Sequence, residues 1–73
     1  MTDETVMPLE RFQAPYGRAV ELLEVRYESG MCLLRVRIRE GSRFTILDLD
    51  PSTAAHWGGA MSAWAERTGS EGP

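Results

Sequence analysis

Charged and branched apolar residues alternate strictly along Arg35-Val36-Arg37-Ile38-Arg39, near the middle of the chain. A repeat of two residues is typical of a β-strand that turns one face toward a core and the other toward solvent. Residues that favour tight turns lie on both sides of this stretch, at Ser29-Gly30 and Gly41-Ser42. The pattern therefore predicts the middle strand of an antiparallel meander, with arginines on one face and aliphatic side chains on the other.

The neighbouring segments predict two more strands and one helix. Residues 18–28 alternate with a phase slip at Leu22-Leu23, and residues 43–49 alternate again. Asp50-Pro51 indicates a helix start, because aspartate can accept hydrogen bonds from the first free amides and proline is tolerated at the first helical position. A helix over 51–67 would turn one apolar stripe toward the sheet, made of Ala54, Trp57, Met61 and Trp64.

These segments predict a single α+β domain over residues 1–73, with one C-terminal helix packed on one face of an antiparallel meander, in the order β-β-β-α. We expect an irregular N-terminal segment at 1–17, the meander at 18–49, the helix at 51–67 and a disordered tail at 68–73. A short edge strand within residues 9–13 would make the sheet four-stranded instead of three-stranded, although the nearby prolines disfavour it.

If both turns are two-residue loops, counting outward sets the register of the three strands. Arg35 would then lie between Glu24 and Asp48 in a charged row across one face. Cross-strand pairs of opposite charge stabilise a sheet by about 0.2–1 kcal/mol each. The face toward the helix would collect the apolar set Leu23, Val25, Tyr27, Cys32, Leu34, Val36, Ile38, Thr45, Leu47 and Leu49.

The outer face of this predicted sheet mixes arginine with apolar side chains, a composition enriched in protein interfaces. Phe44 would lie opposite Arg39, and Ile46 opposite Arg37. Two other interpretations stay open: the face belongs to a monomer whose arginine stems cover the apolar atoms, or residues 1–17 fold across it. The candidate interaction surface comprises Leu22, Leu33, Arg35, Arg37, Arg39, Phe44 and Ile46.

A chain of 73 residues buries only just enough surface for independent stability. Its one cysteine excludes an internal disulfide, and together with one histidine it cannot complete the four side-chain ligands of a structural zinc site. Self-association, as a homodimer, is therefore the expected way to add buried surface.

The net charge of −3 argues against nucleic acid as the partner, because such binding rests on neutralising phosphates. All eight basic residues are arginine, which fits either bidentate recognition or the coding bias of a GC-rich genome. Residues 35–43 nevertheless carry four arginines against one glutamate, a balance of +3. Single-stranded nucleic-acid binding on the sheet, with Phe44 as a stacking platform, is therefore the second hypothesis.

The sequence contains no motif for catalysis, a cofactor or a metal: no phosphate-binding glycine loop, no paired ligands and no nucleophile beside a base. We interpret His56 as an ordinary helix histidine and Cys32 as a small core residue. Neither a membrane span nor a basic signal peptide is visible, which predicts a cytoplasmic protein. We therefore expect a non-catalytic protein-interaction domain that uses the outer sheet face or a strand edge. An accessory subunit of an enzyme is the third hypothesis.

Overall fold

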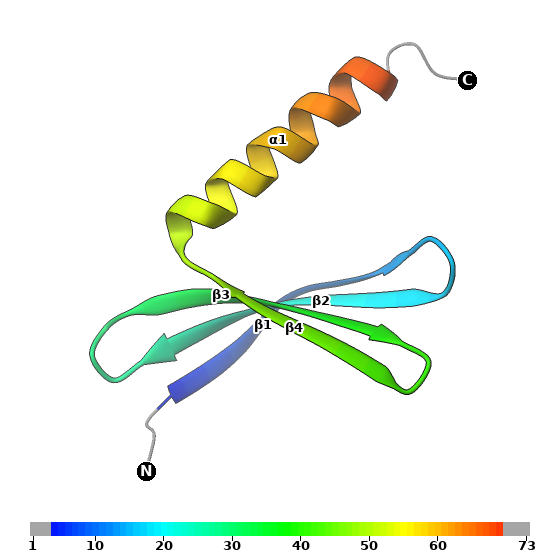
Figure 1. The fold of residues 1–73 in the computed structure, drawn as a ribbon. Coiled ribbons are helices and arrows are strands. Elements are labelled where there is room, and N and C mark those ends of the chain that lie inside the picture. Colours follow the sequence, from blue (N-terminus) through cyan, green and yellow to red (C-terminus); the bar gives the residue numbers. More distant parts are fainter. Residues whose placement is uncertain (1–3, 70–73) are drawn as a thin grey trace.

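The computed structural model describes residues 4–69 and shows a four-stranded antiparallel sheet followed by one helix (Figure 1). The strands pair in chain order as β1 Glu4–Ala14, β2 Arg18–Tyr27, β3 Cys32–Glu40 and β4 Arg43–Leu49. Helix α1 spans Pro51–Gly69. The predicted α+β class is confirmed, and the sheet has the fourth strand that the sequence left open.

The N-terminal segment that we expected to be irregular contains the longest strand of the sheet. β1 pairs with β2 throughout, except where the register shifts between Pro8 and Glu10 and leaves Leu9 outside the pairing. Pro8 is tolerated because β1 is an edge strand, where a missing amide proton need not break a ladder. The bulge changes the phase of the side chains, so β1 shows no continuous alternation in the sequence.

The start of α1 at Pro51 is as predicted. Asp50 caps the helix, because the Thr53 N–H donates to Asp50 Oδ1 at 3.0 Å. Hydrogen bonds from the hydroxyl and the backbone amide of Thr53 lower the pKa of the Asp50 carboxyl. The helix ends at Gly69, two residues beyond the predicted end, and residues 70–73 of the predicted tail lie outside the described residues.

The hairpin between β3 and β4 has the expected two-residue loop. Glu40 pairs with Arg43, and Gly41 between them has a φ of +63°. A positive φ at the first loop position is what a type II′ turn requires. The predicted register of these two strands is therefore confirmed, with Arg35 opposite Asp48.

The hairpin between β2 and β3 has a three-residue loop, which corrects the two-residue loop expected. The Tyr27 N–H donates to the Met31 carbonyl, and the Gly30 N–H donates to the Tyr27 carbonyl, both at 2.9 Å. Gly30 closes this loop at a φ of +95°, a conformation that glycine adopts at no steric cost. The register consequently shifts by one residue, and Arg35 lies opposite Leu23 instead of Glu24.

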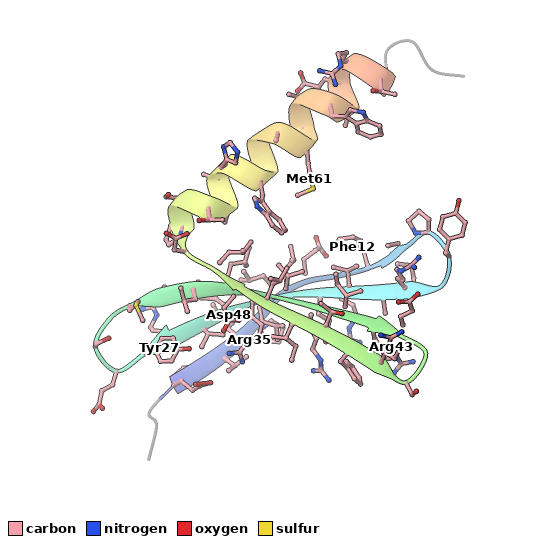
Figure 2. All side chains as sticks on the ribbon, viewed as in Figure 1. Phe12, Tyr27, Arg35, Arg43, Asp48 and Met61 are labelled. Atoms are coloured by element: carbon pink, nitrogen blue, oxygen red, sulfur yellow. The ribbon has the colours of Figure 1, made fainter. Side chains whose placement is uncertain are left out.

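This shift moves every side chain of β2 to the face opposite the one predicted, because strand side chains alternate. We call one face the arginine face; it carries Glu21, Leu23, Val25, Tyr27, Leu33, Arg35, Arg37, Arg39, Phe44, Ile46 and Asp48. The other is the helix-side face, which carries Phe12, Val20, Leu22, Leu34, Val36, Ile38, Leu47 and Leu49. Figure 2 shows Arg35 and Asp48 on the side of the sheet away from α1, and Phe12 on the side toward it.

Very little of the described chain is buried. Val20 and Leu49 are buried on the helix-side face, and Val25 is fully buried on the arginine face between Val6 and Leu33. The radius of gyration is 14.7 Å. A compact chain of this length would have a radius of gyration of about 11 Å. The single chain therefore builds only a small core.

Helix α1 packs on the sheet through its beginning only. It contacts β3 and β4 but neither β1 nor β2, and Figure 1 shows its C-terminal end directed away from the strands. The stripe residues Trp57, Met61 and Trp64 are 41%, 60% and 58% exposed. The expectation that the tryptophans pack into a core is therefore wrong, because the helix diverges from the sheet before it reaches them.

Candidate interaction surfaces

A row of opposite charges crosses the arginine face on β1, β2 and β3. Arg11 Nη2 donates to Glu21 Oε2 at 2.9 Å, and Arg37 Nη1 lies 3.6 Å from Glu21 Oε1. The hydrogen bond from Arg11 and the charges of both guanidiniums lower the pKa of Glu21. This row was missed in the sequence because the predicted register placed Glu21 on the other face.

Arg35 pairs with Asp48, as predicted, but not with Glu24. Its Nε donates to Asp48 Oδ1 at 2.8 Å, and its Nη2 donates to Asp48 Oδ2 at 3.1 Å. These bonds lower the pKa of Asp48 and raise that of Arg35. Glu24 accepts a hydrogen bond from Arg26 at 3.0 Å instead. Two donors of Arg35 are thus already engaged within the sheet.

Arg37 and Arg39 are the arginines of this face that are best placed to meet a ligand. The Arg37 guanidinium carbon lies 4.7 Å from the ring centre of Phe44, which is a cation–π contact. Within residues 4–69, Arg39 forms no salt bridge or side-chain hydrogen bond. Both line a shallow depression of about 380 Å³ together with Arg11, Gln13, Ala19, Glu21 and Phe44. Three arginines against one glutamate give this depression a balance of +2.

Six of the seven residues of the predicted interaction surface share the arginine face: Leu33, Arg35, Arg37, Arg39, Phe44 and Ile46. Leu22 does not, since it pairs with Val36 on the helix-side face. Nor do residues 4–17 fold across the arginine face, and residues 1–3 lie outside the described residues. β1 lies within the sheet, Phe12 is on the helix-side face, and Tyr16 in the following turn is 90% exposed. A binding role for the six residues stays a prediction.

A second surface, which the sequence did not predict, lies where α1 and the helix-side face diverge. We call it the wedge surface and define it by Phe12, Leu47, Trp57, Met61 and Trp64. Phe12 and Leu47 on the sheet are 47% and 39% exposed. Figure 2 shows Met61 on α1 and Phe12 on the sheet on the two sides of the open space.

At the base of the wedge lies a largely apolar hollow of about 280 Å³, lined by Leu9, Glu24, Cys32, Leu33, Leu34, Pro51 and Ala54. Cys32 is half-buried there, so it is less enclosed than the core position expected for it. The hollow joins the first turn of α1 to the sheet. The wedge surface thus begins where the first turn of α1 meets the sheet, and it opens outward from there.

Helix α1 contains two glycines near its middle, Gly58 and Gly59, and no contact within the described chain compensates for their cost to helix stability. Each costs a helix about 0.5–1 kcal/mol relative to alanine. A Cβ atom at Gly58 or Gly59 would meet nothing within 4 Å, so no contact within the described chain requires glycine there. Gly58 follows Ala54 by four residues and precedes Met61 by three, which places it beside the apolar stripe. Gly58 is the sequence signal that could have pointed to the wedge.

The described residues offer little else to a ligand. No three His, Cys, Asp or Glu side chains in this part of the chain are arranged to hold a metal ion, and His56 is exposed on α1. Within residues 4–69 there is no helix that is both long enough and apolar enough to cross a membrane.

The fold and the surfaces define a small α+β protein with two distinctive features, an arginine-bearing sheet face and an open apolar wedge. The chain belongs to a protein family described as a family of unknown function (DUF6967), whose model matches residues 3–67. Comparisons with curated proteins and with solved structures found no match. The family match spans all four strands and α1 up to Arg67.

Proposed function

We propose that this chain is a small, non-catalytic protein-interaction domain that associates with itself. The observation that carries the proposal is the imbalance between buried and exposed apolar side chains. Among the described residues three apolar side chains are buried, whereas twelve large ones are more than a third exposed. Monomeric proteins rarely leave large contiguous apolar patches in water, and such patches mark interaction sites.

Self-association would add stability to a chain of this size. A single hydrophobic core in a domain this small rarely supplies more than about 3–5 kcal/mol, and one cysteine cannot form an internal disulfide. Association with the folded form stabilises it by mass action. We place the domain in the cytoplasm, where its one thiol would stay reduced.

Light scattering coupled to size-exclusion chromatography tests the proposal. We expect a particle of twice the chain mass of 8.2 kDa, whose apparent mass falls on dilution. A mass of 8.2 kDa at every concentration, with no protein recovered in a pull-down, would overturn it.

Single-stranded nucleic-acid binding is the second candidate, and one observation favours it. Arg39, which forms no salt bridge among the described residues, lies on one face with Arg37 and the exposed Phe44 ring that Arg37 contacts. Fewer arginines are available to a nucleic acid on this face than the sequence predicted. Arg35 is engaged with Asp48, and Arg43, next to Phe44 in the strand, points to the opposite face.

A further inference from the structure

We propose that a second copy of the chain covers the wedge surface and packs its own wedge surface, including the apolar stripe of its α1, against it. The inference rests on the proposed self-association. It differs from the surface predicted from the sequence, which was the arginine face or a strand edge.

The first turn of α1 is anchored to the sheet, and this anchored turn forms the narrow end of the wedge. α1 begins one residue after β4, Asp50 caps it, and Thr53 and Ala54 are half-buried against the sheet. Beyond this turn every helix residue is exposed up to Gly69. The side chains of the stripe and those of the sheet therefore do not cover one another. An apolar element from another molecule is needed to exclude water from the space between them.

α1 itself is an element of this kind. It carries the apolar stripe of Trp57, Met61 and Trp64, and Gly58 beside the stripe leaves room for another backbone to approach. Glycine in the interior of a helix is unfavourable unless close packing compensates. No atom of the described chain supplies that packing at Gly58. A helix of a second copy would supply it.

The area available matches a stable dimer. The chain exposes 5895 Å². A compact protein of this mass exposes about 4,500 Å². The surplus is on the order of 1,000 Å² per chain, so two copies could bury about 2,000 Å² in total, which reaches the range of obligate homodimers.

The charge of the arginine face makes it a less favourable dimer interface than the wedge surface. A two-fold contact brings one patch against its own copy. The depression around Arg37 carries a balance of +2, so a contact that joins two such depressions would place like charges against each other. The wedge surface has only uncharged side chains, and the helix-side face around it carries three arginines and three glutamates, a balance of zero.

The wild-type chain permits a test without substitutions, because its two tryptophans, Trp57 and Trp64, both belong to the wedge surface. In the dimer we expect blue-shifted tryptophan emission that iodide quenches weakly. On dilution below the dissociation constant the emission should move to the red, and quenching should become strong. Emission that is red and strongly quenched in a particle of dimer mass would overturn the inference.

A pair of matched substitutions gives the second test. Met61 and Ile46 are 60% and 56% exposed in the single chain, so Met61→Glu and Ile46→Glu should disturb its own packing equally little. We expect Met61→Glu to raise the dimer dissociation constant about 30-fold or more, because it buries a charge at the centre of the interface. Ile46→Glu on the arginine face should leave the constant unchanged.

The outcomes separate this inference from the proposed function. A dimer that Ile46→Glu disrupts and Met61→Glu does not would overturn the wedge arrangement and leave self-association standing. A wild-type chain that is monomeric at every concentration would overturn both. Circular dichroism of each variant, compared with the wild type at the same concentration, reports whether the fold survives, and the iodide result decides the question if Met61→Glu does not fold.

Discussion

Arg35 and Asp48 face each other across β3 and β4 and share two hydrogen bonds, from Nε to Oδ1 at 2.8 Å and from Nη2 to Oδ2 at 3.1 Å. Their side chains are 26% and 32% exposed, which makes this the least exposed salt bridge of the described chain. Bidentate geometry and partial burial both strengthen such a pair. The contact links a central strand to an edge strand, next to the start of α1.

We expect a coupling energy of about 0.5–1 kcal/mol between Arg35 and Asp48, because the pair is partly shielded from water. Urea unfolding of Arg35→Ala, Asp48→Ala and the double variant measures it as a double-mutant cycle. The pair Arg18 and Glu40, 40% and 52% exposed, is the control and should couple more weakly. Equal coupling in both cycles would contradict the role assigned to burial.

The stability of the chain should fall as the pH falls below about 4, the ordinary pKa of a carboxyl group. Hydrogen bonds in the folded state lower the pKa of Asp48, Glu21 and Asp50. Below their ordinary pKa the unfolded chain binds more protons than the folded one, so the stabilisation present at neutral pH is lost as the pH approaches the folded-state values. Urea unfolding between pH 7 and pH 3 measures this loss. Asp48→Asn should be less stable at neutral pH and lose less on acidification; an identical loss would show that Asp48 is not part of it.

Val25→Ala should destabilise the chain by about 2 kcal/mol, since it removes a fully buried branched side chain from the small core. The control is Val6→Ala. Val6 pairs directly with Val25 but is 45% exposed, so its loss should cost less than about 1 kcal/mol. Thermal or urea unfolding checks both. Equal effects would mean that the face around Val6 is covered in solution.

Substitution by alanine should change the stability of the chain in opposite directions at two glycines, Gly30 and Gly59. Gly30→Ala forces alanine into a φ of +95° and should destabilise the chain by about 1–2 kcal/mol. Gly59→Ala should stabilise it by about 0.5–1 kcal/mol, because Gly59 is helical, has open space around it and lies away from the stripe. Unfolding midpoints measure both changes. A destabilising Gly59→Ala would place a second molecule on that side of α1.

A labelled single-stranded oligonucleotide should bind weakly or not at all at low salt, because the net charge is −3 and Arg35 is engaged by Asp48. Fluorescence anisotropy at about 20–50 mM salt is the measurement, since phosphate contacts are strongest there. Binding that Arg37→Ala and Arg39→Ala abolish and Arg18→Ala does not would favour the nucleic-acid hypothesis over this expectation.

The parts of the fold that could be predicted are those that short stretches of sequence encode. Alternation along Arg35–Arg39, the glycine at Gly41 and the Asp50-Pro51 start each act over a few residues, and each is found as expected. β1 was largely missed because a bulge at Leu9 interrupts its period of two. The β2 register was missed because Ser29-Gly30 is compatible with a loop of two or three residues.

The candidate surfaces show the same division. Residues on β3 and β4 were assigned to the correct face, whereas Leu22 was not, because a shift of one residue exchanges the two faces of a strand. The exposure of Trp57 and Trp64 could not be predicted, since an apolar stripe on a helix is the same whether its own sheet or another molecule covers it.

By itself the sequence determined the α+β class, the meander order, the face that carries Arg35, Arg37 and Arg39, and the residue at which the helix begins. These follow from local backbone preferences and side-chain alternation. Only the tertiary structure decided two further features. One is which side chains of neighbouring strands share a face of the sheet, and the other is that α1 leaves the sheet after its first turn. Both depend on contacts between segments far apart in the chain, whose energies no local pattern records.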